Sequence, residues 1–305
     1  MAKHEKIVRT DASGDVFLRS GMLLTYFIDM PVHAAHGLAA LFDHYVATIP
    51  KGALQWGITS ATSEQWKRLD SKTIERCKES MTGDQAKKGK LTAFDLRDSA
   101  GAPPVYGFRL AGKPSGRDFP DGVTLAQMAF PIDQGTDERQ VERLVDEVRK
   151  LSNMIEFFYG YCSPALLYGE SQLLPALMEL PGLALRHPGY DVQCNHITRL
   201  KLGCRVRGAR WITLLGTKLT ALAGGTALLR KKLDPKITLE KIGGGVMIRA
   251  GKVPELGDVN RRDRAPLLRS LAGALEPLTY FGESDLPFKE VDDTLLPRWE
   301  RRLLD

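Results

Sequence analysis

The stretch Ile242-Gly243-Gly244-Gly245-Val246-Met247-Ile248-Arg249-Ala250-Gly251 decides how the C-terminal part of this chain folds. Three consecutive glycines lose much conformational entropy on folding, so they indicate a backbone that needs positive φ or a close approach. The apolar run after them predicts a short buried strand, and Gly251 predicts a second turn before a charged loop and a helix. A phosphate-binding loop would need Lys-Ser or Lys-Thr after the glycines, and a dinucleotide site would need a strand-GxGxxG-helix order. Neither is present, so we interpret the glycines as a structural turn.

Outward from this stretch, the chain alternates between strand and helix patterns. Runs rich in β-branched and aromatic residues predict strands over 16–28, 54–58, 91–96, 105–110, 123–130, 157–162, 195–206, 237–242 and 246–249. Apolar spacing and helix start and stop signals predict helices over 31–49, 136–151, 166–180, 211–222, 266–275 and 295–304, and the polar stretch 63–81 is also assigned to a helix. Turn-rich segments between the strands of 91–130 indicate an antiparallel meander. The predicted fold class is α+β, a mainly antiparallel sheet flanked by helices.

The length allows two domain organisations. A chain of 305 residues can form one large domain or two small ones. We expect a single domain over 1–305. The order strand, helix, strands, helix occurs before about residue 153 and begins again after it. Two similar subdomains at about 15–153 and 154–305 therefore remain an alternative that sequence identity does not decide.

Composition and charge indicate an ordinary globular protein, with 43% hydrophobic and 26% charged residues. A formal charge of +6 and a pI near 9.1 would favour an acidic partner or nucleic acid. Basic pairs such as Arg261-Arg262 and Arg301-Arg302 nevertheless sit among aspartates and glutamates, so we interpret the excess as dispersed, solvated charge. Only Tyr106-Gly107-Phe108-Arg109 resembles a base-stacking strand, and a hydrophobic strand explains it equally well.

The cysteines and the N-terminus predict a cytoplasmic protein. Cys77, Cys162, Cys194 and Cys204 are widely spaced and form no CxxC pair, so free thiols are expected. The first ten residues are charged and lack the apolar core of a secretory signal. The most apolar stretch, 211–229, contains a lysine, four threonines and three glycines, which favours a buried helix over a membrane span.

Three histidines near the first helix raise the question of a metal site. His33, His36 and His44 fall on roughly one helix face. His44, however, lies about 12 Å beyond His36 at about 1.5 Å per residue, so one ion cannot bind both. We interpret them as surface or half-buried histidines and expect no metal and no other cofactor.

Two residues, Ser171 and Cys162, are candidate nucleophiles. Ser171 follows Gly169-Glu170, but the second glycine of a GxSxG nucleophile elbow is absent. Cys162 could pair with His196, yet nothing near it in sequence distinguishes it from a buried small apolar residue. We therefore expect no catalytic residues and a binding protein. A hydrolase using Cys162 or Ser171, and a basic nucleic-acid-binding protein, stay open as alternatives.

Several motifs together resemble a known family. They are Leu24-Thr25-Tyr26-Phe27, Leu54-Gln55-Trp56, Gly208-Ala209-Arg210-Trp211-Ile212-Thr213-Leu214-Leu215-Gly216, Ala223-Gly224-Gly225, and the glycine stretch running on to Pro254 and Gly257-Asp258-Val259-Asn260. Over roughly 15–285 the chain resembles the TsiV-type immunity family of bacterial type VI secretion systems. The resemblance implies a cytoplasmic protein that binds and blocks a cognate antibacterial effector, encoded by the adjacent gene. Some members of the family are paired with VRR-Nuc-type nucleases, whose DNA-binding surface the immunity protein occludes.

The resemblance implies a protein partner, without a membrane or direct nucleic-acid contact, and leaves the oligomeric state open. An inhibitor that imitates DNA would be acidic, so the +6 charge favours steric plugging or pairing with the effector's metal-binding carboxylates, and an acidic effector of another kind is equally open. We expect specificity to reside in exposed loops. The candidate contact residues are Lys87, Lys88, Lys90, Arg117, Asp118, Arg261, Arg262 and Arg264; solvated loops are the alternative for each group.

Overall fold

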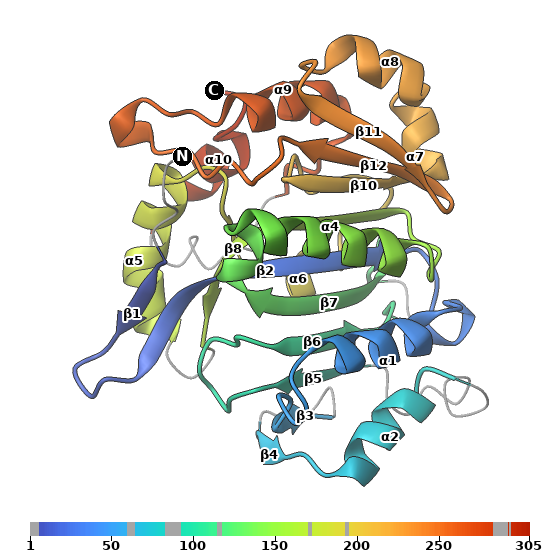
Figure 1. Cartoon of the computed structure of the whole chain (residues 1–305), viewed down its shortest axis with the longest axis vertical. Coiled ribbons are helices and arrows are strands. Elements are labelled where there is room, and N and C mark those ends of the chain that lie inside the picture. Colours follow the sequence, from blue (N-terminus) through green and yellow to red (C-terminus); the bar gives the residue numbers. More distant parts are fainter. Residues whose placement is uncertain are drawn as a thin grey trace.

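A single twisted sheet organises the protein (Figure 1). The structure, a computed structural model, describes residues 6–59, 65–82, 93–114, 118–169, 173–192, 195–282, 292 and 294–305, except the side chain of His196. The strands are β1 (Val8–Thr10), β2 (Val16–Ile28), β3 (Trp56–Ile58), β4 (Lys67–Arg68), β5 (Ala93–Arg97), β6 (Gly107–Ala111), β7 (Thr124–Pro131), β8 (Tyr159–Tyr168), β9 (Asp191–Val192), β10 (Ile212–Gly216), β11 (Ile237–Ile242) and β12 (Gly245–Ala250).

The strand order is β11-β12-β10-β8-β2-β7-β6-β5-β3-β4, with β1 added to β2 and β9 to β8. The pairing of β8 with β9 is parallel, and the other strand pairings of the described residues are antiparallel. Strands β5, β6 and β7 are consecutive neighbours, as the predicted meander requires. The prediction of an α+β fold with a mainly antiparallel sheet is confirmed.

Helices cover both faces of the sheet. They are α1 (Leu38–Thr48), α2 (Ser71–Glu79), α4 (Glu138–Ser152), α5 (Leu173–Arg186), α6 (Asn195–Thr198), α7 (Thr217–Leu222), α8 (Gly225–Lys232), α9 (Pro266–Leu275) and α10 (Leu295–Arg301), with short 3-10 turns η1 (Val32–Ala34), η2 (Ile132–Gly135), η4 (Val259–Arg261) and η5 (Glu276–Leu278). One hydrophobic core joins the sheet to α1, α4 and α5, and the second core includes leucines of α7, α8 and α9.

Strand β2 explains why its sequence is almost continuously apolar. Tyr26 and Ile28 belong to the first core, whereas Phe27 between them belongs to the second core. A strand that is buried on both faces has no polar side to alternate with. Its neighbours β7 and β8 pair with it along most of its length, so β2 lies at the centre of the sheet.

The glycine stretch forms the predicted turn, which joins β11 and β12 into a hairpin. Ile242 pairs with Gly245, so Gly243 and Gly244 make a two-residue turn between β11 and β12. A Cβ on Gly245 would lie 2.1 Å from the carbonyl oxygen of Leu215, which explains the need for glycine at this position. Gly251, with φ of 87°, makes the second turn. The interpretation as a structural turn is confirmed.

Several predicted elements were wrong, and in two of them, 166–180 and 211–222, strand pairing overrode local propensity. The helix expected over 166–180 begins only at α5, because β8 continues to pair with β2 as far as Tyr168. The strand expected over 195–206 is instead the short α6 followed by irregular chain. The helix expected over 211–222 is β10 followed by α7, because Ile212 to Leu215 pair with both β8 and β12. No helix of the described residues is long and apolar enough to cross a membrane.

The two proposed subdomains share the sheet. The first long strands of the two subdomains, β2 and β8, pair antiparallel at the centre of the sheet. Strands β3 to β7 extend the sheet on one side and β10 to β12 on the other. The division at about residue 153 stays a prediction.

Candidate functional site

Four of the eight candidate contact residues lie in the described part of the chain, at two separate places. Lys87, Lys88, Lys90 and Arg117 lie outside the described residues. Asp118 is exposed in the turn before β7, where the following residues bond to the backbone of Arg199 and Gly203. The remaining three, Arg261, Arg262 and Arg264, lie together in one exposed loop. We call residues 258–265 the arginine loop. The structure does not bring Asp118 into contact with it.

Backbone hydrogen bonds close the arginine loop on itself. The amide of Asp258 donates to the carbonyl of Asp263 at 2.8 Å, and the amide of Asp263 donates back at 3.0 Å. The Asp258 carboxylate also accepts from the amide of Asn260, and the Asp263 carboxylate accepts from the amide of Ala265. A loop held by so many internal bonds loses little further entropy when it binds, which favours tight recognition.

The backbone of the loop is strained. Arg262, at φ 62°, and Ala265, at φ 50°, are the non-glycine residues of the described chain with positive φ. Such conformations cost free energy and persist only where the surroundings impose them, and they cluster at functional sites. Ala265 is fully buried, which anchors the end of the loop. The Arg261 side chain, by contrast, is 81% exposed.

An ion pair ties the loop to α5. The Asp258 carboxylate accepts from Nε of Arg186 at 3.1 Å and from its terminal nitrogen at 2.9 Å, a bidentate arrangement. This hydrogen bonding by Arg186 lowers the pKa of Asp258 to about 2. Nδ1 of His187 also lies 2.7 Å from the carbonyl oxygen of Gly257. The position of the loop is therefore set by the end of α5.

Positive charge is concentrated in this part of the chain. Residues 195–282 contain 17 Lys and Arg against 6 Asp and Glu, a net +11, whereas the whole chain carries +6. The remainder is therefore acidic overall. The acidic neighbours of single basic clusters conceal this difference between the two parts of the sequence. An excess of positive charge favours an acidic partner.

The catalytic and metal candidates have no constellation around them in the described residues. Cys162 is fully buried in the first core, and burial raises the pKa of its thiol, which opposes formation of a nucleophilic thiolate. Ser171 and the His196 side chain lie outside the described part. His44 pairs with Glu147 at 2.5 Å, and no group of three His, Cys, Asp or Glu side chains among the described residues could hold a metal ion.

A buried polar network around Asp191 was not predicted from the sequence. Asp191 is fully buried and accepts hydrogen bonds from Arg210 at 2.8 Å, from Tyr161 at 2.5 Å and from Arg207 at 3.4 Å. Burial alone would raise its pKa, but Arg207 and Arg210 outweigh that effect and the pKa of Asp191 is lowered. Arg207 and Arg210 lie on either side of the motif glycine Gly208. Nothing in the sequence marks Asp191 as their partner.

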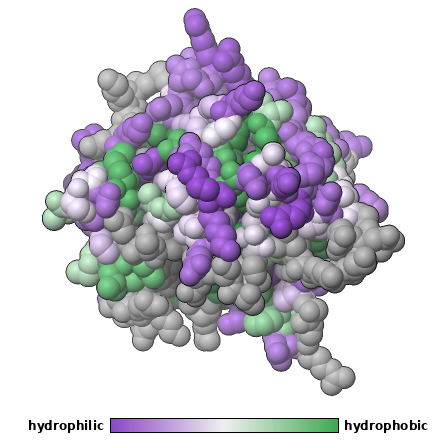
Figure 2. Space-filling view, turned by 90° about the horizontal axis from the view of Figure 1, so that it is seen from below, coloured by the Kyte–Doolittle hydropathy of each residue, from purple (hydrophilic) through white to green (hydrophobic). Residues whose placement is uncertain are grey.

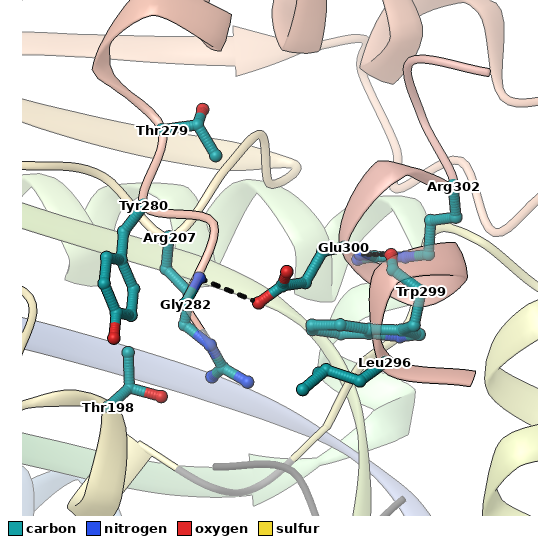
Figure 3. Close-up of a pocket in the computed structure, with 9 residues that line it drawn as sticks. All are labelled: Thr198, Arg207, Thr279, Tyr280, Gly282, Leu296, Trp299, Glu300 and Arg302. Atoms are coloured by element: carbon teal, nitrogen blue, oxygen red, sulfur yellow. Dashed lines mark hydrogen bonds between the residues drawn. The ribbon is translucent and has the colours of Figure 1, made fainter. Parts of the chain in front are cut away.

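Beside this network lies a small cavity of about 30 Å³ (Figure 3). Its lining residues are Thr198, Arg207, Thr279, Tyr280, Gly282, Leu296, Trp299, Glu300 and Arg302. Figure 3 shows Arg207 reaching into the space between Tyr280 and Trp299, and the Glu300 carboxylate accepts from the amide of Gly282 at 3.1 Å. Such a volume holds about one or two water molecules, whereas ligand pockets measure roughly 300–1,000 Å³. This cavity does not suit an organic substrate.

Comparison with known proteins identifies relatives of the whole chain. A family model, TsiV, described as type VI immunity for VRR-NUC, matches residues 37–303. Among solved structures, a Pseudomonas aeruginosa T6SS protein, PA0821, is similar with a TM-score of 0.77 and 18% sequence identity, covering 98% of this chain and 87% of that chain. At that identity the likeness shows a shared fold. No relative is found among curated proteins.

Proposed function

This chain belongs to the TsiV family of type VI immunity proteins for VRR-NUC, and from that premise we propose that it binds and neutralises a cognate effector without catalysis. The effector is a VRR-NUC-type nuclease encoded by the adjacent gene. Because such a toxin attacks DNA, the immunity protein acts in the cytoplasm. It works by covering the surface with which the nuclease holds its metal or its DNA.

The observation that carries this proposal is the family match over 37–303. The charge distribution supports it. A nuclease that uses metal ions holds them with carboxylates, so its active cleft is acidic before the metal and DNA enter. The +11 charge of residues 195–282 suits such a cleft and would accelerate association.

The arginine loop is the proposed contact. Arg261, Arg262 and Arg264 are exposed on a strained and internally bonded backbone, so they are presented to a partner in a fixed arrangement. Arginine is enriched among side chains that dominate binding energy, and each such residue typically contributes about 2 kcal/mol or more when truncated. Arginine also matches carboxylates with two parallel hydrogen bonds.

Nucleic-acid binding is the second candidate, and the same +11 charge is the observation that favours it. Contacts to phosphates would make affinity fall steeply with salt concentration. A filter-binding or fluorescence-anisotropy titration with generic duplex DNA at low salt separates the two functions. Absence of binding at low salt removes this candidate.

Co-expression tests the proposed function. The toxin-like gene adjacent to this one is expressed with and without the chain, growth is followed, and the chain is captured by an affinity tag. We expect rescued growth and a stoichiometric complex. A neighbour that is toxic but neither captured nor neutralised would refute the role.

Charge reversal of the loop tests the contact residues. The variant Arg261→Glu/Arg262→Glu/Arg264→Glu should lose capture and protection. The matched control is Lys218→Glu/Lys231→Glu/Lys232→Glu, which makes the same charge change at exposed residues of α7 and α8. Equal losses in both variants would indicate a general charge effect and argue against the loop.

A further inference from the structure

We propose that the exposed face of α5, together with β1 and the arginine loop, forms one docking surface for the effector. Its occupant is a face of the effector with an apolar centre and carboxylates beside it. The proposal rests on the proposed function and adds to it the apolar contact that the arginines alone do not supply.

The outward face of α5 carries large apolar side chains without a partner. Leu174 is 76% exposed and Met178 is 78% exposed, the highest values among the exposed large hydrophobic residues of the described chain. With Gly182 they follow each other at intervals of four, so they share one side of the helix. The opposite side of the helix packs into the first core, where Ala176 and Leu180 are fully buried. Leu174 and Met178 are therefore not needed to attach α5 to the sheet.

Two ion pairs show that β1 and the arginine loop each adjoin α5. Nε of Arg9 in β1 lies 2.7 Å from the Glu179 carboxylate in α5, and Arg186 of α5 binds Asp258 of the loop. Figure 1 shows β1 beside α5 on the left of the molecule. Each neighbour adds an apolar side chain, Val8 at 39% and Val259 at 45% exposure. Four of the exposed large hydrophobic residues of the described chain thus lie on these three elements.

The charges on this surface decide the chemistry of the partner. Its two acidic groups at the element junctions, Glu179 and Asp258, are both engaged by arginines of the chain itself. Arg262 and Arg264 are exposed in the same loop as Asp258, on either side of the exposed Asp263. A partner must therefore bring carboxylates to the loop and an apolar patch to Leu174 and Met178. Methionine suits such a contact because its side chain is flexible and polarisable.

A second copy of this chain fits the surface less well. Stable homodimers bury about 2,000 Å² or more through largely apolar faces. Here four apolar side chains are spread over three elements and separated by ion pairs. This arrangement is typical of a non-obligate interface between different proteins. For comparison, the end of the molecule formed by α2, β3 and β4 is largely hydrophilic at its centre in Figure 2, and its hydrophobic residues lie in separate patches.

The test compares two single substitutions of exposed apolar residues. Met178→Gln lies on the proposed surface, and Leu222→Gln, at a residue 58% exposed in α7, lies off it. The probe is the purified product of the adjacent toxin-like gene with its own sequence, made by cell-free synthesis and kept inactive by chelating divalent metal ions, so that its metal-binding carboxylates stay in place. Calorimetric titration gives Kd for each variant, and sedimentation equilibrium without the probe gives the oligomeric state.

We expect Met178→Gln to weaken binding at least about 30-fold, the loss typical of a dominant interface side chain, and Leu222→Gln to leave Kd unchanged. If wild type binds and Met178→Gln binds equally well, the docking surface is wrong while the proposed function stands. If wild type does not bind the probe, both fail. A wild-type dimer that Met178→Gln converts to a monomer would assign the α5 face to a second copy and overturn the effector as its occupant.

Discussion

Asp191 provides the sharpest test of how the second half of the sheet is held together. It is fully buried between two arginines, and Asp191→Asn removes its charge while keeping its size. The asparagine oxygen can still accept a hydrogen bond, but the asparagine NH2 group is a donor and would face arginine side chains that are also donors. Arg207 and Arg210 then lose the buried carboxylate that both of them contact.

The expected loss follows from the contacts that disappear. Asp191 accepts from Arg210 at 2.8 Å, from Tyr161 at 2.5 Å and from Arg207 at 3.4 Å. Hydrogen bonds to charged groups contribute about 1.5–3 kcal/mol each, and removal of one member of a buried ion pair costs about 3–5 kcal/mol. We therefore expect Asp191→Asn to lower the free energy of unfolding by about 3–5 kcal/mol. That is a large share of the roughly 5–15 kcal/mol that a domain has.

Urea denaturation followed by tryptophan fluorescence measures this loss at pH 7, with Asp118→Asn as the matched control. Asp118 is exposed, so its variant should stay within about 0.5 kcal/mol of wild type. The pKa of Asp191 is lowered by folding, so its stabilisation is complete above the unfolded-state value and is lost as the pH falls through the folded-state value. Asp191→Asn should remove that part of the acid sensitivity. A loss below about 1 kcal/mol would refute the view that Asp191 compensates the buried arginines.

Three further predictions concern the glycine hairpin, the arginine loop and the thiols. Gly245→Ala should lower the free energy of unfolding by about 1–3 kcal/mol, because the added Cβ would clash with the Leu215 carbonyl. Gly182→Ala has nothing within 4 Å of the added Cβ, so it should raise the free energy of unfolding by about 0.5–1 kcal/mol. Urea denaturation measures both, and equal effects would contradict the packing argument. Asp258→Asn should speed amide hydrogen exchange in the arginine loop. In wild type, protection should be complete above about pH 4 and decline toward pH 2, because the folded pKa of about 2 lies below the unfolded value; unchanged exchange in the variant would show that Arg186 does not hold the loop. A thiol reagent should modify the half-buried Cys204 before the buried Cys162, and loss of protection in Cys162→Ser without loss of stability would instead reveal a catalytic thiol.

Part of the site could be predicted from local charge. Arg261, Arg262 and Arg264 lie within four residues of each other next to a turn, so their place in an exposed loop follows from the sequence. Their rigidity does not, because it depends on Arg186, which is 72 residues away from Asp258 along the chain. Leu174 and Met178 belong to a largely apolar helix, and only packing decides which of its sides stays exposed.

The sequence by itself determined the elements whose signals are local: the turn at Gly243 and Gly244, the helix predicted from residue 136, and the meander of β5 to β7. Turn residues, caps and helical spacing act within a few residues, so they can be read along the chain. The tertiary structure decided β8 and β10, because their apolar runs suit a strand or a buried helix equally well. The choice came from backbone hydrogen bonds to β2 and β12 and from burial on both faces, which only distant residues supply.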